Sequence, residues 1–335
     1  MYQNVSSKHL NSTRERAQLD RPRVSVVICA YTEERWATLC EALASLEAQT
    51  QPPHEVIVVV DHAERLQERV RTHFPDVQVV ANQERRGLSG ARNSGVRHAV
   101  GDVVAFLDDD ARADPNWLAG LVAAYDRTSV VGTGGEVVPR WSGSQPAWLP
   151  AEFYWVVGCS YEGLPREPSE IRNPLGANMS FRREVIERVG GFTQGIGRIG
   201  TTPLGCEETE LAIRVRRETG GGLILYLPDA RAEHLVTPAR TTWRYFRSRC
   251  WSEGLSKALV TSHVGKEQAL ATERGYAIRT LPRGVVRNLV ALARGDAQGL
   301  LRAGAIVAGL AITAAGYIRG RMALVWGGSS VISSC

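Results

Sequence analysis

Residues 103–110 have the sequence VVAFLDDD, an apolar run of five residues that leads into three consecutive aspartates. A short run rich in β-branched residues is typical of a buried strand. Because successive side chains of an extended chain face opposite ways, we expect Asp108 and Asp110 to point to one side and Asp109 to the other. Two carboxylates in one small volume repel each other, and a divalent cation converts that repulsion into a binding site. Oxygen ligands of this kind favour Mg2+ or Mn2+ over zinc.

A purely structural role explains the same three acids less well. Aspartates that follow a strand can cap the next helix. Asp114 followed by Pro115, however, is a better cap and first-turn pair than any of the three. The pattern by itself leaves a metal or phosphate site and a structural role as the two interpretations.

The composition describes a globular protein with a sizeable core. Its 335 residues are 44% hydrophobic, which suffices for one large domain or two small ones. The net charge of +5 is spread without a dense basic run, so nucleic acid is not an expected partner, whereas phosphate-bearing ligands and anionic membranes are compatible with it. The six cysteines form no CxxC pair and no signal peptide precedes them, which favours a reducing, cytoplasmic location.

Strands and helices alternate from residue 24 onward. β-Branched runs predict strands at 24–30, 55–60, 77–80 and 103–107, and helical periodicity predicts helices at 33–47 and 87–99. This alternation is typical of an α/β domain with a parallel sheet covered on both faces. Ligands of such sheets gather beyond the carboxyl ends of the strands. Polar groups lie at three of those ends: the turn from Ala30 through Tyr31 to Glu33, then Asp61, then the three aspartates.

A glycine-rich turn precedes the second of these helices. In ERRGLSGARNSGV, residues 84–96, Gly87 and Gly90 let a ligand approach the backbone N–H groups at the positive end of the helix. Arg92 offers a planar fork to a phosphate. Because a glycine-rich turn is a weak signal, a plain loop with a solvated arginine is the alternative interpretation.

Four of these segments, VSVVICAYTEERW, VVVD, RGLSGARNSG and FLDDDA, occur in an order that resembles the nucleotide-sugar domain of glycosyltransferase family 2. The resemblance extends over residues 22–255. It implies the GT-A fold, a Rossmann-like domain with a mostly parallel central sheet, whose Asp-x-Asp motif holds a metal ion bound to a sugar diphosphate. It also implies an inverting, metal-dependent transfer of a sugar from a nucleoside-diphosphate sugar, with UDP as the first expectation, to a hydroxyl acceptor.

The resemblance further implies which residues bind the donor. It places the turn formed by Ala30, Tyr31 and Glu33 around the nucleoside, together with Asp61, and it places Arg92 near the nucleotide. Asp109 lies within the same donor-binding motif. Asn178, in the small-residue turn GANMS, would lie beside the donor sugar.

Metal ligands and a catalytic base follow from the same resemblance. Asp108 and Asp110 would hold Mg2+ or Mn2+, with His234 after a later strand completing the site. A cation there stabilises the departing diphosphate as a Lewis acid. The family's acidic pair, usually Glu-Asp, is here Glu207 and Glu208. Glu208 is the expected base for the acceptor hydroxyl, and Glu207 and Glu210 are the alternatives because a glutamate reaches one methylene further.

The C-terminal part changes character. Residues 303–318 are uncharged, but a spanning helix needs about 20 apolar residues, so the segment is marginal. Residues 303–318 therefore form either a membrane-embedded or interfacial helix or an apolar helix packed on the catalytic domain, and any membrane contact is expected within residues 284–326. Arginines at 283, 287 and 294 favour contact with the inner face of the cell membrane. We accordingly expect a flexible tail at 1–21, a GT-A domain at 22–262 and a helical segment at 263–335.

Two other functions fit a parallel sheet with a carboxylate-bound metal. A nucleotidyltransferase usually has a glycine-rich, lysine-containing loop after the first strand, and residues 30–35 contain neither residue. A non-catalytic protein of the same fold would bind a sugar nucleotide without transferring the sugar. For the enzyme, a polyprenyl-phosphate-linked glycan is the expected acceptor if the C-terminal segment contacts membrane, and a small glycoside if it does not.

Overall fold

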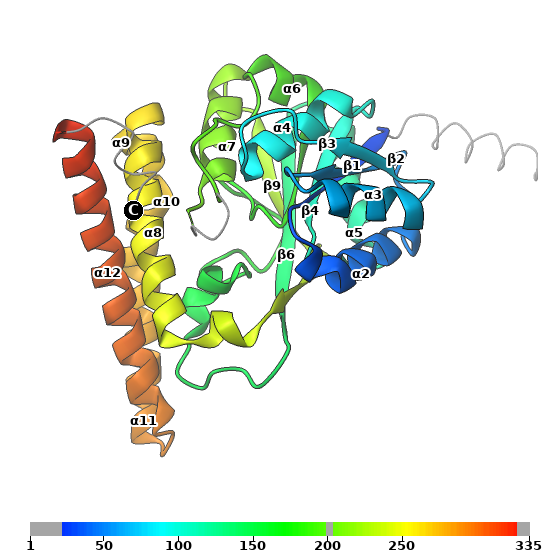
Figure 1. Cartoon of the computed structure of the whole chain (residues 1–335). Helices are drawn as coiled ribbons and strands as arrows, with labels where there is room; N and C mark the ends of the chain where they lie inside the picture. The colour runs from blue at the N-terminus through cyan, green and yellow to red at the C-terminus, as the bar shows by residue number, and fades with distance from the viewer. Residues whose placement is uncertain (1–21, 199–203, 327–335) are drawn as a thin grey trace, which may run out of the picture.

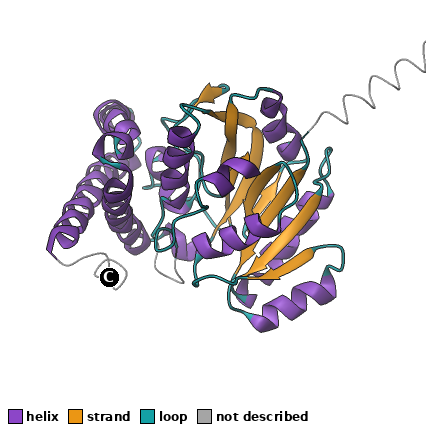
Figure 2. Ribbon diagram, turned by 90° about the horizontal axis from the view of Figure 1, so that it is seen from above, coloured by secondary structure: helices purple, strands orange, loops and turns teal. Residues whose placement is uncertain are grey.

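The computed structural model describes residues 22–198 and 204–326, so the expected tail at 1–21 lies outside the described residues. Figure 1 shows a layered α/β domain beside a group of C-terminal helices that stand roughly parallel to one another. From above, in Figure 2, the strands form one twisted sheet with helices on both of its faces. The predicted α/β class is therefore confirmed.

The first half of the sheet is parallel, as predicted. Its strands are β1 (Val24–Ala30), β2 (Glu55–Val60), β3 (Gln78–Ala81) and β4 (Val103–Asp108), in the spatial order β3-β2-β1-β4. Alternate residues of β1 enter different cores: Val26 and Ile28 pack on one face and Val27 on the other. This is the burial expected of strands that are covered on both sides. Because the four strands are parallel, the polar residues that follow them lie at one edge of the sheet.

The second half is mixed. Strand β8 (Asn178–Arg182) runs antiparallel to both β4 and β6 (Val130–Trp141), and β9 (Leu223–Val236) runs parallel to β6. Strand β9 continues past Pro228 to Val236, because a bulge in the pairing with β6 accommodates residues 228–231. Pro228 has no N–H to donate and is tolerated at such an irregularity. Short strands β5 (Ala111–Ala113) and β7 (Ser169–Glu170) both pair with β9.

Helices cover both faces of the sheet. On one face lie α2 (Trp36–Glu47), α3 (Glu64–His73) and α5 (Trp117–Val122), and on the other α4 (Leu88–His98), α6 (Arg183–Arg188) and α7 (Glu207–Glu218). Short 3-10 segments follow β1 at η1 (Glu33–Arg35), α5 at η2 (Ala123–Asp126), β6 at η3 (Ala151–Val157) and β9 at η4 (Pro238–Thr241). Residues of the loops after β1, β2, β4 and β6 line the same cavity as residues of the C-terminal helices.

The C-terminal helices begin earlier than expected. Helix α8 (Trp243–Val264) lies beside α12 (Gln298–Trp326) in Figure 1, so the expected boundary at residue 262 falls inside α8. Between them come α9 (Lys266–Ala269), α10 (Ala271–Gly275), the π-helical segment η5 (Tyr276–Thr280) and α11 (Leu281–Ala293). Glycines allow the close contact: a Cβ on Gly316 would lie 2.4 Å from the carbonyl oxygen of Trp251. The helical unit thus starts at Trp243.

Helix α12 has 29 residues, and its most apolar window of 18 residues has a mean hydropathy of 1.6, so by length and composition the helix could cross a membrane. One third of its most apolar window is buried inside the protein. The outward sides of η5, α11 and α12 carry a band of exposed large apolar residues: Ile278, Val286, Leu289, Val290, Leu300, Leu301, Val307, Leu310, Ile318, Met322, Val325 and Trp326. The helix therefore has one face packed on α8 and another open to its surroundings.

Candidate active site

A single large cavity of about 1240 Å3 lies where the strand ends meet the C-terminal helices. Residues after β1, β2 and β4 line one part of it, as expected for a sheet of this type. Helices α8 and α12 and segment η5 line another part. The catalytic domain and the helical unit therefore share one cavity.

Asp108, Asp110 and His234 come together in this cavity, with their ligand atoms within 4.8 Å of one another. The pairing of β5 with β9 places Ala111 opposite His234, and this brings His234 Nε2 to 3.2 Å from Asp110 Oδ1. That oxygen is buried and accepts no hydrogen bond among the described residues. A buried carboxylate oxygen without a donor fits a bound cation. Two carboxylates with an imidazole are a ligand set that suits Mn2+.

Two arginines compensate the charge of these acids. Arg35, from η1, lies 2.6 Å from Asp109 Oδ1 and 3.2 Å from Asp110 Oδ2. Arg240, from η4, lies 3.1 Å from Asp110 Oδ2 and 3.2 Å from His234 Nε2. Against the effect of burial, His234 and the two arginines lower the pKa of Asp110 far below its usual value. Asp110 is thus held as an anion, the form that binds a metal ion.

Asp109 has a different environment from its two neighbours. Burial raises the pKa of its carboxyl to about 7, although Arg35 opposes the shift. Its side chain lines the cavity wall and hydrogen-bonds to Arg35. Sequence reasoning did not single out Arg35 or Arg240, because each reaches the aspartates from a separate loop after a different strand.

The three glutamates at the start of α7 differ in their partners. Glu207 accepts a hydrogen bond from Arg92 Nη1 at 2.7 Å, and Glu210 forms a two-pronged pair with Arg214, with both N···O distances at 2.7 Å. Glu208 bonds only to the hydroxyl of Thr209, at 3.0 Å, among the described residues, and it lines the cavity. Glu210 does not line it. Of the three, Glu208 alone combines access to the cavity with a carboxylate that no cation holds.

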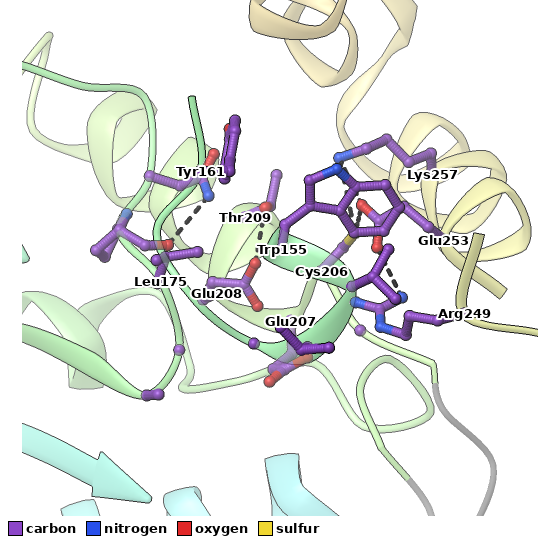
Figure 3. Close-up of a pocket in the computed structure, with 18 of the residues that line it drawn as sticks. Trp155, Tyr161, Leu175, Cys206, Glu207, Glu208, Thr209, Arg249, Glu253 and Lys257 are labelled. Carbon is purple, nitrogen blue, oxygen red and sulfur yellow. Dashed lines mark hydrogen bonds and ion pairs between the residues drawn. The ribbon is translucent and has the colours of Figure 1, made fainter. Parts of the chain in front are cut away.

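Figure 3 shows Glu207 and Glu208 side by side on the cavity wall, next to Cys206. Burial, followed by repulsion from Glu207, raises the pKa of Glu208 to about 7. A carboxyl with such a pKa can both accept and release a proton near neutral pH. Cys206, at the N-terminal end of α7, has a left-handed backbone with a φ of +71°. Strained non-glycine residues of this kind cluster at functional sites.

Arg92 connects the metal cluster with the acidic pair. It is buried, and its guanidinium bonds to Glu207 and to the carbonyl oxygen of Gly176 at 2.9 Å, with Asp108 Oδ1 at 3.6 Å. The arginine predicted near the nucleotide does line the cavity. The N–H groups of Arg92, however, face Glu207 and Asp108. Arg92 therefore orients these two carboxylates and also contributes positive charge to the cavity.

Three of the four residues predicted to surround a nucleoside lie in the wall of the cavity. Ala30, Tyr31 and Asp61 line it. Asp61 accepts hydrogen bonds from Asn82 and from the backbone N–H of Gly87, which joins the second strand end to the glycine-rich turn. Glu33 does not line the cavity: it is exposed and lies 3.6 Å from Arg69 of α3. The prediction for Glu33 is corrected, because η1 turns this side chain outward and Arg35 inward.

The structure also corrects the prediction for Asn178. Its side chain is fully buried, donates to the carbonyl oxygens of Glu136 and Ala230, and accepts a hydrogen bond from Trp117 at 2.8 Å. All of its hydrogen-bonding groups are therefore used between strands. The preceding residues of the same turn, Gly176 and Ala177, line the cavity instead. Asn178 is a core residue because β8 begins there.

A network of buried ion pairs forms the cavity wall on the side of the C-terminal helices. Lys257 of α8 lies 3.1 Å from Glu253 and 2.6 Å from Glu273 of α10, and Arg172 also pairs with Glu273 at 2.6 Å. Arg249 lies 2.9 Å from Glu253. Against the effect of burial, these cations lower the pKa of Glu253 and of Glu273 to about 2. The sequence offered no signal for this network, whose members come from three separate segments.

The mixed sheet, the Asp-Asp-His cluster and a glutamate in the same cavity are features of a nucleotide-sugar-dependent transferase. The chain belongs to glycosyltransferase family 2. The model of that family, glycosyl transferase family 2, matches residues 25–190. A glucosyl-dolichyl phosphate glucuronosyltransferase of Haloferax volcanii is 39% identical over 242 residues, which cover 71% of this chain and 77% of the relative. The protein is a glycosyltransferase, so the nucleotidyltransferase and the non-catalytic binder are set aside.

More distant relatives share the catalytic domain. A probable N-acetylgalactosaminyltransferase 9 of Caenorhabditis elegans is 27% identical over 242 residues, which cover 64% of this chain and 40% of the relative. Among solved structures, a mannosyltransferase from Pyrobaculum calidifontis in complex with GDP-Man and Mn2+ has a TM-score of 0.58 at 23% identity and covers 95% of this chain and 94% of its own. GalNAc-T7 with UDP, GalNAc and Mn2+ has a TM-score of 0.50 at 20% identity and covers 70% and 48%. These likenesses confirm the GT-A fold.

Proposed function

We propose that this protein is an inverting, metal-dependent glycosyltransferase that moves a sugar from a nucleoside-diphosphate sugar to a hydroxyl of a lipid-phosphate-linked acceptor at a membrane surface. The observation that carries the proposal is the presence, in one cavity, of the cluster of Asp108, Asp110 and His234 and of the unpaired carboxylate of Glu208. Both solved relatives described above contain a nucleotide or sugar nucleotide with Mn2+.

Donor binding falls to the strand-end side of the cavity. Ala30, Tyr31 and Asp61 would contact the nucleoside. Because of Asp61, UDP is the first nucleotide to test. Asp108, Asp110 and His234 would hold Mg2+ or Mn2+. Such a cation, when bound, offsets the negative charge that grows on the leaving diphosphate.

Glu208 would act as the base. The acceptor O–H would donate its proton to the Glu208 carboxylate while the hydroxyl oxygen forms a bond to the anomeric carbon of the sugar. The bond from that carbon to the diphosphate oxygen breaks, and the nucleoside diphosphate leaves with the electron pair. Attack from the face opposite the leaving group inverts the anomeric centre. Arg92, bonded to Glu207, keeps the acidic pair next to the metal ligands.

The lipid-linked acceptor rests on two observations. The Haloferax volcanii relative is named for a glucosyl-dolichyl phosphate substrate. In this chain, the exposed apolar band of η5, α11 and α12 adjoins the helices that line the cavity. Large exposed apolar patches mark interaction surfaces, and this one suits the boundary of a lipid bilayer. Arg283, Arg294 and Arg319, all exposed, would face anionic headgroups at the cytoplasmic side.

The proposal is tested with the full chain, Mn2+, and UDP-, GDP- and dTDP-sugars. Thermal stabilisation measures donor binding, and release of nucleoside diphosphate measures transfer or slow hydrolysis. We expect Asp110→Asn to abolish metal-dependent stabilisation. Glu208→Gln should keep that stabilisation and lose transfer by roughly 10^2- to 10^4-fold, the usual contribution of a general base.

The matched control is Glu218→Gln. Glu218 is exposed at the far end of the same helix, α7, and forms no ion pair among the described residues, so its removal should leave both readings unchanged. The proposal fails if no sugar nucleotide stabilises the protein in a metal-dependent way. It also fails if Glu208→Gln transfers sugar at the rate of the unmodified protein.

A further inference from the structure

The buried ion-pair network beside Glu208 has an excess of positive charge. It contains three cations, Arg172, Arg249 and Lys257, and two carboxylates, Glu253 and Glu273. All five side chains line the cavity that also contains Glu208. These side chains are 13–24% exposed, and a partly buried cluster with one more cation than carboxylates attracts an anion. The network therefore favours an anionic group in this part of the cavity.

Arg249 has donors to spare. Among the described residues, its guanidinium donates one hydrogen bond, from Nη1 to Glu253, whereas Arg172 uses Nε and both terminal nitrogens. Arg249 also lies over the ring of Trp155, at 5.6 Å, which fixes the plane of its fork. Figure 3 shows Arg249, Glu253 and Lys257 grouped on α8, with Trp155 and Cys206 between them and Glu208. A planar guanidinium with free N–H groups matches the oxygens of a phosphate.

Apolar residues from two segments also line the cavity: Leu310 and Ala314 of α12, with Ala277 and Leu281. We call these four residues the apolar arm of the cavity. Leu310 is also a member of the exposed apolar band. The exposed apolar band therefore reaches the lining of the cavity at Leu310.

We infer, resting on the proposed function, that Arg249 binds the phosphate of the lipid-linked acceptor, whose hydrocarbon chain leaves the cavity between α12 and residues 277–281. Each part of such an acceptor then has a matching group in the cavity. The sugar hydroxyl meets Glu208, the phosphate meets Arg249, and the apolar chain passes Leu310 and Ala314.

The test measures binding of farnesyl phosphate, farnesol and inorganic phosphate to the full chain by quenching of tryptophan fluorescence, with neither donor nor metal present. Farnesyl phosphate should bind more tightly than either farnesol or inorganic phosphate alone. Arg249→Gln should weaken binding of farnesyl phosphate by roughly 10- to 100-fold, as for loss of charge-assisted hydrogen bonds, and leave farnesol unaffected. Arg247→Gln, an exposed arginine of the same helix that does not line the cavity, is the control.

A second pair of variants tests the apolar arm. Ala314→Trp should fill the arm and weaken binding of farnesyl phosphate and farnesol alike while sparing inorganic phosphate. Ala311→Trp changes an exposed residue of α12 outside the cavity and should have no effect. Equal binding of farnesyl phosphate by Arg249→Gln and Arg247→Gln would overturn the inference, as would tight binding of inorganic phosphate alone. This binding measurement contains neither metal nor donor, so its outcome does not depend on sugar transfer. A failure of this inference can therefore be distinguished from a failure of the proposed function.

Discussion

Three glutamates within one turn of helix have three distinct environments because their hydrogen-bond partners differ. Glu207 accepts a hydrogen bond from Arg92 and Glu210 from Arg214, whereas Glu208 accepts one from the neutral hydroxyl of Thr209. All three lie in the first turn of α7. The partners of Glu208 and Glu210 are local, at the next residue and one turn further along the helix, whereas Arg92 lies 115 positions from Glu207. Only the folded chain brings Arg92 to Glu207 and so distinguishes Glu207 from Glu208.

Transfer should depend on pH through Glu208. A base works in its ionised form, so kcat should fall about tenfold for each unit of pH below about 7 and level off above it. Initial rates between pH 5.5 and 8.5 at saturating donor and acceptor measure this profile. In Glu208→Gln the residual rate should lose the inflection. Because burial also raises the pKa of Asp109 to about 7, an inflection retained in Glu208→Gln would assign it to another group.

The same pKa has a consequence for stability with the opposite sign. The folded state holds the proton of Glu208 up to about pH 7, whereas the unfolded chain releases it near the ordinary glutamate pKa of 4.5. Folding stability from this residue therefore falls as pH rises from 4.5 to 7. Glu208→Gln removes the titrating group, so the unmodified enzyme should lose more stability over that interval than the variant does.

At the scale of elements, the pairing of β5 with β9 assembles the metal cluster. The register places Ala111 opposite His234, so Asp110 and His234 become neighbours although 124 positions separate them. The acids at the end of β4 were predictable because an apolar run followed by aspartates is a local pattern. The contact with His234 was expected only from the family resemblance, since β9 continues past Pro228 by means of a bulge that no local pattern indicates.

The α8–α12 interface should depend on a glycine. Gly316→Ala would place a methyl group 2.4 Å from the backbone oxygen of Trp251, so we expect a net loss of roughly 1–3 kcal/mol as the helices separate. Gly304→Ala, in the same helix, meets no atom within 4 Å and should stabilise by about 0.5–1 kcal/mol through helix propensity. Denaturant unfolding of both variants measures the difference. Equal shifts would contradict the close contact.

At the scale of the whole molecule, the position of α12 bears on how the protein meets a membrane. Helix α12 lies beside α8, which carries Arg244, Arg247 and Arg249 in its first half. If α12 crossed a bilayer in this arrangement, these charges would enter the hydrocarbon region at a cost of several kcal/mol. We therefore propose that α12 lies in the interface, with its outer face in lipid and its inner face on α8.

Association with vesicles tests this arrangement. Ile318→Glu combined with Val325→Glu places charges on the outer face of α12, where these side chains are 58% and 74% exposed. Flotation with anionic liposomes should show loss of most of the bound fraction, since each buried aliphatic side chain contributes about 1.5–3 kcal/mol. Val100→Glu changes a residue of the catalytic domain that is 51% exposed and serves as the control. If the double variant and the unmodified protein float equally well, α12 is not the part of the protein that contacts the membrane.

The sequence by itself determined the α/β class, the four parallel strands and the acids at the strand ends, because buried strands and their polar ends are local patterns of side-chain type. The family motifs added the metal ligands and the acidic pair. Only the tertiary structure decided which glutamate faces the cavity, that Asn178 is buried and Glu33 turned away, and that Arg35, Arg240 and Arg249 line the cavity. These outcomes depend on contacts between segments far apart in the chain, and such contacts arise from packing.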